Sequence, residues 1–77
     1  MDHDGIMLYR TDPARNMARF YALALQPSLF GDVALVRRWG RLGTHGRCII
    51  ELHADRAGAM RALEHHRRIK LRRGYRV

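Results

Sequence analysis

The hydrophobic pattern of this chain changes its period once, and that change constrains the fold more than any other feature. Before residue 54, short segments rich in apolar residues are expected to be strands, whose side chains alternate between two faces, at 6–10, 17–25, 33–41 and 47–53. Over residues 54–70 apolar residues recur at steps of three and four, which is typical of one face of a helix. Strands followed by a single helix predict an α+β domain, in which a small twisted antiparallel sheet of four to five strands carries one α-helix across one face.

The residues between these segments are typical of turns and helix ends. Connections are expected at 11–16, 26–32 and 42–46, each of which holds a proline or a glycine. Asp55 is the expected N-cap of the helix, and Gly74 is placed to end it, after which 75–77 can add a short strand. Within the helix, Glu64 can pair with Arg68 one turn later.

In the segment 33–41, the alternation of side chains puts a charged residue on the same face as apolar ones. Strict alternation places Trp39 on the same face as Leu35 and Arg37, so a charged residue lies beside apolar ones. Either this face leaves the core after Leu35, or a bulge near Arg37 shifts the register. Both alternatives predict that Trp39 turns outward. The segment 17–25 is apolar on both faces, which predicts a central strand, with a short helix as the alternative.

The chain has 77 residues, which predicts one domain over 1–77 with a loose segment at 1–5. A domain of this size buries only about 60% of its unfolded surface. Cys48 is the single cysteine, so no internal disulfide can form, and we expect it to be a small buried apolar residue. The histidines and Cys48 show no CxxC or HxxxH spacing, and no nucleophile motif is present. We therefore predict no metal site, no cofactor and no catalytic residues, so that the protein is not an enzyme.

The charge balance is strongly basic and almost entirely due to arginine. Fourteen arginines and Lys70 face seven acidic residues, which gives a formal net charge of +8. Such an excess is expected for a protein with an anionic partner, and the planar fork of arginine suits phosphate. A GC-rich coding sequence would give the same composition without any function. No signal peptide and no run of about 20 apolar residues is visible, so we expect a cytoplasmic protein without a membrane partner.

One ordered set of motifs extends along most of the chain. Asn16 is followed by the Phe-Tyr pair at 20–21, then by Arg-Trp-Gly-Arg at 38–41 and the Gly-Thr-x-Gly turn at 43–46. Lys70 and a Gly-Tyr pair at 74–75 close the set. In this order, over about residues 16–76, the motifs resemble a WGR domain, which is named after its Trp-Gly-Arg. The resemblance implies a small twisted antiparallel sheet with one helix packed on it.

The resemblance also implies a role in nucleic-acid binding. WGR domains occur in DNA-damage-dependent poly(ADP-ribose) polymerases, in molybdate-regulator-like bacterial proteins and as stand-alone bacterial chains. In the polymerases the domain binds DNA next to a strand break, near a 5′ end. The motif tryptophan packs on a terminal nucleotide and the motif arginine helps connect DNA to neighbouring domains, and these positions match Trp39 and Arg41. This chain is too short for the catalytic domain of those polymerases, so we expect no ADP-ribosylation from it.

The predicted interface combines one stacking residue with several phosphate ligands. An indole stacked on a nucleotide contributes about 1–3 kcal/mol for any base. Gly40 would let a ligand approach the backbone. The predicted nucleic-acid-binding residues are Trp39, Gly40, Arg41, Arg38, Arg47 and Lys70. DNA is favoured over RNA as the partner.

Three alternatives remain open from the sequence. The same Trp/Arg patch would suit a protein-interaction module that docks an acidic protein partner or a second copy of the chain, because both residue types are enriched at interface hot spots. The basic hairpin would also serve simply as a solvated surface. A small RNA-binding protein is supported by the charge alone.

Overall fold

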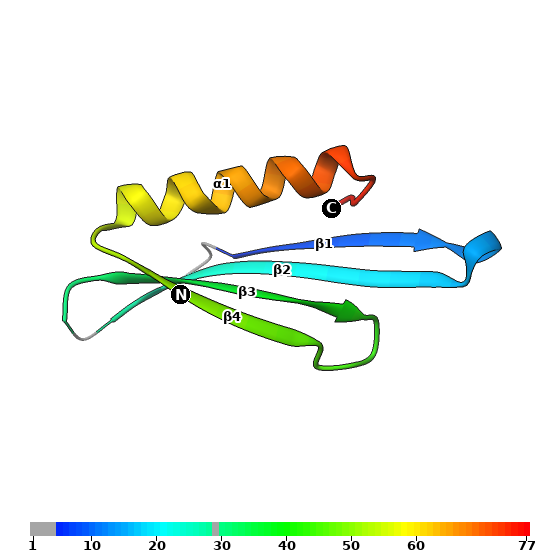
Figure 1. Ribbon diagram of the computed structural model, residues 1–77, viewed down its shortest axis with the longest axis horizontal. Helices are drawn as coiled ribbons and strands as arrows, with labels where there is room; N and C mark the ends of the chain where they lie inside the picture. The colour runs from blue at the N-terminus through cyan, green and yellow to red at the C-terminus, as the bar shows by residue number, and fades with distance from the viewer. Residues whose placement is uncertain (1–4, 29) are drawn as a thin grey trace.

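The computed structural model describes residues 5–28 and 30–77 of the chain. The elements, in order, are β1 (Gly5–Asp12), a 3₁₀ turn (Pro13–Arg15), β2 (Met17–Pro27), β3 (Val33–Arg41), β4 (Arg47–His53) and α1 (Arg56–Arg72). The strands form one antiparallel sheet in the order β1-β2-β3-β4, and α1 lies across one face of it (Figure 1). The α+β class predicted from the change of period is confirmed.

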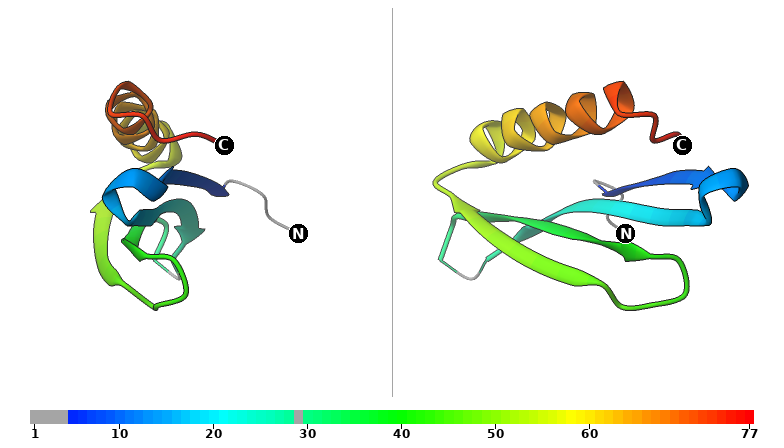
Figure 2. Two further views of the ribbon diagram at one scale, coloured as in Figure 1. Left: turned by 90° about the vertical axis from the view of Figure 1, so that its right-hand side faces the viewer. Right: turned by 45° about the vertical axis from the view of Figure 1, so that its right-hand side comes forward.

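The last residues of the chain pair with the outer edge of β1. Tyr9 and Arg76 exchange two backbone hydrogen bonds, each with an N···O distance of 2.7 Å. This contact is a single antiparallel bridge and not a full strand, so the described sheet has four strands at the lower end of the expected range. The turned views in Figure 2 show the C-terminal segment returning from α1 towards β1.

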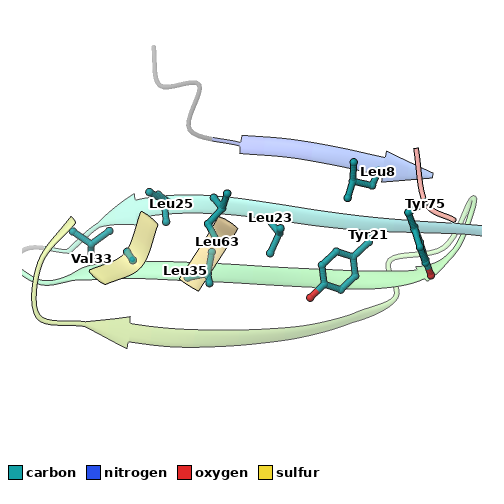
Figure 3. Close-up of a cluster of buried hydrophobic side chains, with 9 residues drawn as sticks. Leu8, Tyr21, Leu23, Leu25, Val33, Leu35, Leu63 and Tyr75 are labelled. Carbon is teal, nitrogen blue, oxygen red and sulfur yellow. The ribbon is translucent and has the colours of Figure 1, made fainter. Parts of the chain in front are cut away.

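The core lies between α1 and one face of the sheet. Each strand presents every second residue to this face, and the helix adds Ala59 and Leu63 from positions one turn apart. The buried residues of the sheet face that pack here are Leu8, Tyr21, Leu23, Leu25, Val33 and Leu35, as Figure 3 shows. Of the two apolar faces of 17–25, the one that carries Tyr21, Leu23 and Leu25 therefore lies under the helix.

Both ends of α1 follow the predicted capping. The Asp55 side chain accepts a hydrogen bond from the Gly58 N–H at 2.8 Å. At the other end Gly74 has a positive φ of 96°, and the Tyr75 N–H donates to the Lys70 carbonyl at 3.1 Å. This is the arrangement of a Schellman motif, which only glycine adopts without strain. It turns the chain back so that Tyr75 is buried beside the sheet.

The conflict within β3 is resolved without a bulge. β2 and β3 pair continuously, with Leu23 opposite Arg37 and Tyr21 opposite Trp39. The first alternative therefore holds, since the face becomes polar after Leu35 while the register is unchanged. The expectation that Trp39 turns outward is wrong in part. The indole stays on the helix side of the sheet, where it is half-buried and packs against the core.

Two smaller expectations are corrected at the edges of the sheet. Residues 1–4 of the segment expected to be loose lie outside the described residues, whereas Gly5 begins β1. Cys48 is exposed and not buried, because it lies on the edge strand β4 and on the face opposite α1. Burial predicted from residue type alone fails where a sheet face has no cover.

The glycines of the Trp-Gly-Arg hairpin allow two backbone segments to touch. A Cβ atom at Gly40 would lie 2.7 Å from the Cα of Gly46. Gly46 has a φ of 72°, and a Cβ atom there would collide with the carbonyl oxygen of Trp39 and come within 3.0 Å of the Phe20 ring. The turn therefore folds over Phe20 on the face opposite α1, and only glycine permits this contact.

Substitution of Gly46 by alanine tests this packing. We expect Gly46→Ala to lower the free energy of unfolding by about 3 kcal/mol or more, because it combines backbone strain with a backbone clash. Gly43→Ala is the matched control: its φ is 89°, yet a Cβ atom there meets nothing within 4 Å, so it should cost about 1–2 kcal/mol. Urea unfolding of both variants measures the difference, and equal losses would contradict the packing argument.

Candidate nucleic-acid interface

A surface pocket of ≈ 530 Å³ lies where the start of β2, the end of β3 and the end of α1 meet. We call it the Trp39 pocket. Its lining includes Arg15, Arg19, Trp39, Gly40, Arg41 and Lys70. A pocket of this volume is in the range that small-molecule ligands occupy, about 300–1,000 Å³.

Trp39 is held by the core on one side and lines the pocket on another. Its ring centroid lies 6.1 Å from that of Tyr21, its cross-strand partner, with the two planes tilted by 32°. The Arg37 guanidinium lies 5.7 Å from the indole centroid. Trp39 also lines a second, smaller pocket of ≈ 310 Å³ that it shares with His66 of α1. The indole is therefore fixed in place and still accessible to a ligand.

The register of the sheet places three arginines in one row on the helix-side face. Arg10 pairs with Arg19 across β1 and β2, and Arg19 pairs with Arg41 across β2 and β3. Like charges directly opposite one another destabilise a sheet. The row is thus a local concentration of positive charge beside the pocket, and an anion placed there would relieve the repulsion.

Lys70, near the end of α1, adds a positive charge to the Trp39 pocket. Its ammonium nitrogen lies 4.7 Å from the ring centroid of Tyr21 and 5.4 Å from that of Tyr75. Burial lowers the pKa of Lys70 below its ordinary value, and the positive charges of Arg73, Arg37 and Arg19 lower it further. Both causes disfavour the charged form, and an anion bound at this nitrogen would offset the repulsion from the arginines.

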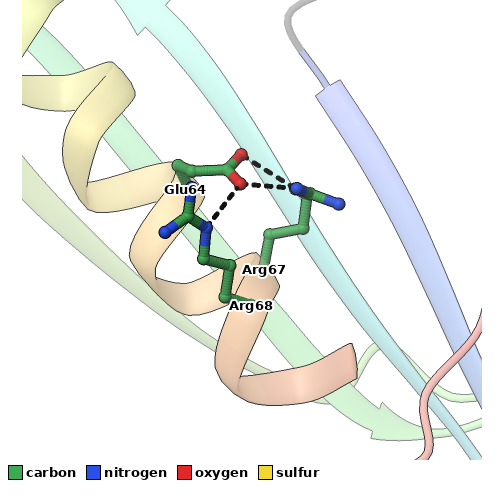
Figure 4. Close-up of polar contacts among 3 residues, drawn as sticks. All are labelled: Glu64, Arg67 and Arg68. Carbon is green, nitrogen blue, oxygen red and sulfur yellow. Dashed lines mark hydrogen bonds and ion pairs between the residues drawn. The ribbon is translucent and has the colours of Figure 1, made fainter. Parts of the chain in front are cut away.

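The acidic residues pair with other basic groups, and one of these is Arg15 of the pocket lining, whose Nε lies 3.7 Å from an Asp12 oxygen. Glu51 forms an ion pair with Arg37, with an N···O distance of 2.9 Å, and Glu64 pairs with both Arg67 and Arg68 on the helix (Figure 4). The predicted pair of Glu64 with Arg68 is therefore present, at 3.0 Å. Among the described residues, no carboxylate lies within ion-pair distance of the pocket cations Arg19, Arg41 and Lys70.

The structure brings together four of the six residues predicted to bind. Trp39, Gly40, Arg41 and Lys70 all line the Trp39 pocket. Gly40 lines it through its backbone, and its missing side chain is explained by the contact with the turn on the other face. The binding role of these residues stays a prediction.

The other two predicted residues lie outside the pocket. Arg47 is directly opposite Trp39 on the same face, but it does not line the pocket. Arg38 is on the opposite face, where its guanidinium lies 5.4 Å from the centroid of the Phe20 ring. Sequence reasoning missed Arg19 and Arg15. Arg19 could have been found from its position two residues before Tyr21, which places both on one strand face.

A polar cluster beside the second pocket joins β3, β4 and α1. Glu51 of β4 has one oxygen 2.9 Å from Arg37 Nε and 3.6 Å from His66 Nε2 of α1, and its other oxygen lies 3.5 Å from His53. Burial lowers the pKa of His66. No group of three or more His, Cys, Asp or Glu in the described part of the chain could hold a metal ion.

Over the same residues, no helix has the length and apolar character needed to cross a membrane.

The titration of Glu64 tests the charge assignment on the helix. Hydrogen bonds from Arg67, and then from Arg68, lower the pKa of Glu64 to about 2. A carboxyl group with a lowered pKa stabilises the fold at pH values above its ordinary range, and this contribution is lost as the pH falls towards 2. We expect the carboxyl carbon signal of Glu64 in an NMR titration to move near pH 2, and Glu64→Gln to remove that part of the acid dependence. A midpoint near 4.5 would contradict the pairing.

Comparisons with known proteins show the family to which this chain belongs. An uncharacterized protein of Sinorhizobium fredii, y4dW, is 46% identical to this chain over 67 residues, which cover 87% of this chain and 33% of that protein. The chain therefore spans about a third of the length of this curated relative. No solved structure matches the chain. The family model of the WGR domain, a non-catalytic nucleic-acid-binding module, matches residues 5–77, and the chain belongs to the WGR domain family.

Proposed function

We propose that this protein binds DNA at ends or nicks through the Trp39 pocket, without catalysing a reaction on it. The observation that carries the proposal is the meeting, in one pocket, of a half-buried tryptophan with three cations, Arg19, Arg41 and Lys70, that have no carboxylate partner among the described residues. A nucleic acid supplies both of the missing groups, a flat base and phosphates. Such a partner would place the protein in the cytoplasm.

The position of the tryptophan favours a terminal or unstacked nucleotide. Inside a duplex both faces of each base are covered by its neighbours, whereas a base at an end, or at a nick that opens, exposes one face. Trp39 is held by Tyr21 on the core side, so it can meet such a base without needing to move. A fixed aromatic group loses little conformational entropy when it stacks on a base.

The cations of the pocket are placed to hold the backbone on either side of that nucleotide. Arg19 and Arg41 lie opposite one another and are both exposed, so their guanidinium forks can reach phosphate oxygens. Lys70 contributes a point charge from above the two tyrosines. Arg47, next to Trp39 on the same face, extends the surface beyond the pocket. Phosphate contacts of this kind position the DNA and carry no base specificity.

A binding titration with four DNA and RNA forms tests the proposal. Nicked, blunt-ended and closed circular DNA and a duplex RNA are compared across salt concentrations. We expect tighter binding to nicked and blunt-ended DNA, with an affinity that falls steeply as salt rises, because each neutralised phosphate adds about 0.9 to the salt slope. No binding at low salt would overturn the proposal. Equal binding to circular DNA would overturn the end-directed part of it.

Substitutions separate stacking from charge. Trp39→Ala should weaken binding to nicked DNA by about 5- to 150-fold, which corresponds to the loss of 1–3 kcal/mol of stacking. Arg19→Gln should weaken binding to every DNA form and lower the salt slope by about 1. Arg38→Gln makes the same change of charge on the opposite face and is the matched control. If Arg38→Gln and Arg19→Gln weaken binding equally, general basicity and not the pocket is responsible.

A further inference from the structure

The face of the sheet opposite α1 is apolar, and among the described residues only the turn at 42–46, which folds over Phe20, covers a part of it. Figure 2 shows the helix on one side of the sheet only. Alternation and the cross-strand pairing assign the uncovered side chains. We call this surface the open face and define it by Met7, Tyr9, Ala22, Ala24, Val36, Arg38, Ile50 and Leu52.

The open face does not have the composition of a surface made for water. A sheet with one solvated face normally alternates apolar residues inside with polar residues outside. Here Ile50 is 62% exposed, Leu52 66% and Met7 38%. Arg38 is the only charged residue among the described strand positions on this face, and its guanidinium lies over the Phe20 ring. A contiguous apolar surface of this kind indicates a contact with another surface.

We propose that the open face packs against the open face of a second copy of this chain, sheet on sheet. This inference is independent of the proposed DNA binding, which uses the other face. The partner of the open face must be apolar and nearly uncharged, because the face offers one guanidinium and otherwise only apolar or neutral groups. A second copy related by two-fold symmetry supplies such a surface without any further requirement.

The distribution of charge favours this occupant over an acidic protein or a nucleic acid. The chain carries a net charge of +8, and the cations without carboxylate partners that we identified, Arg19, Arg41 and Lys70, lie on the side of α1. An anionic partner would therefore be attracted to that side. Two copies that meet through their open faces keep these cations on opposite outer surfaces, which is the arrangement with the least repulsion.

The size of the face predicts a weak association. Four strands about 4.8 Å apart, with about six residues each at 3.3 Å, cover roughly 400 Å². Two such faces bury about 800–1,000 Å² in total, which is below the ~1,200–2,000 Å² of stable complexes. Sheets packed in this way lie about 10 Å apart. We expect a dimer that forms reversibly and only at high protein concentration, as weak, transient interfaces do.

Sedimentation equilibrium of the full chain from about 10 μM to 1 mM tests the proposal. Association through an apolar face between two cationic chains should become tighter as salt rises, because salt screens the repulsion. This is the opposite of the salt dependence of DNA binding, so the two proposals fail separately. A monomer at 1 mM and high salt would overturn the inference.

Neighbouring isoleucines on β4 distinguish a face contact from an edge contact. Ile50 points to the open face, whereas Ile49, which is 43% exposed, lies on the helix side of the same strand. Ile50→Lys should raise the dissociation constant at least about tenfold, since the charge is introduced twice per dimer. Ile49→Lys should leave it nearly unchanged. Equal effects of both substitutions would indicate pairing of β4 edges and overturn the packing of faces.

The thiol of Cys48 gives a readout that needs no substitution. Cys48 is exposed, is the single cysteine and lies next to the open face, on the same side of the sheet and opposite Arg38. Its rate of reaction with a chromogenic disulfide reagent should fall as protein concentration passes through the dissociation constant. A rate constant independent of concentration over a range in which sedimentation shows a dimer would mean that the dimer uses another surface, and would overturn the proposal.

Discussion

The pairing of β2 with β3 is the constraint on which the rest of this structure depends. It fixes Tyr21 opposite Trp39 and Arg19 opposite Arg41, and it does so without a bulge. Because side chains alternate along a strand, a slip of one residue would move the indole to the open face and put Arg38 in the core. The core, the pocket and the uncovered surface are therefore set together by a single register. Burial of the Leu23–Leu25 side of β2 under α1 is what holds that register in place.

The three residues of the Trp-Gly-Arg tripeptide make contacts on both faces of the sheet. Trp39 and Arg41 point to the helix side and line the pocket, whereas the Cα of Gly40 faces the turn that folds over Phe20. Gly40 is therefore needed for the packing of the hairpin, which joins the end of β3 to the start of β4. A ligand-based explanation of all three residues would have missed this structural requirement.

The sequence was sufficient to predict what depends on neighbours along the chain. The strands, the helix, its Asp55 cap and its Gly74 end all follow from local periodicity and local hydrogen bonding. The candidate site was predicted only where it coincides with a motif, as at Trp39 and Lys70. Arg19 joins it through cross-strand pairing, and Arg38 leaves it through alternation, and neither can be read without the register. The exposure of Cys48 was missed for a related reason, because whether a sheet face is covered is a property of the tertiary structure.

The bridge between Tyr9 and Arg76 joins the first strand to the end of the chain. Contacts that span most of a sequence are slow to form, because the whole intervening chain must be ordered before they are gained. During synthesis, β1 can pair with β2 early. The outer edge of β1 cannot form its hydrogen bonds with the segment after α1 until Arg76 has left the ribosome. The helix cannot settle fully on the sheet before then. Formation of the pocket around Lys70 and Tyr75 is thus coupled to completion of the domain, so that an incomplete chain would lack an ordered binding surface.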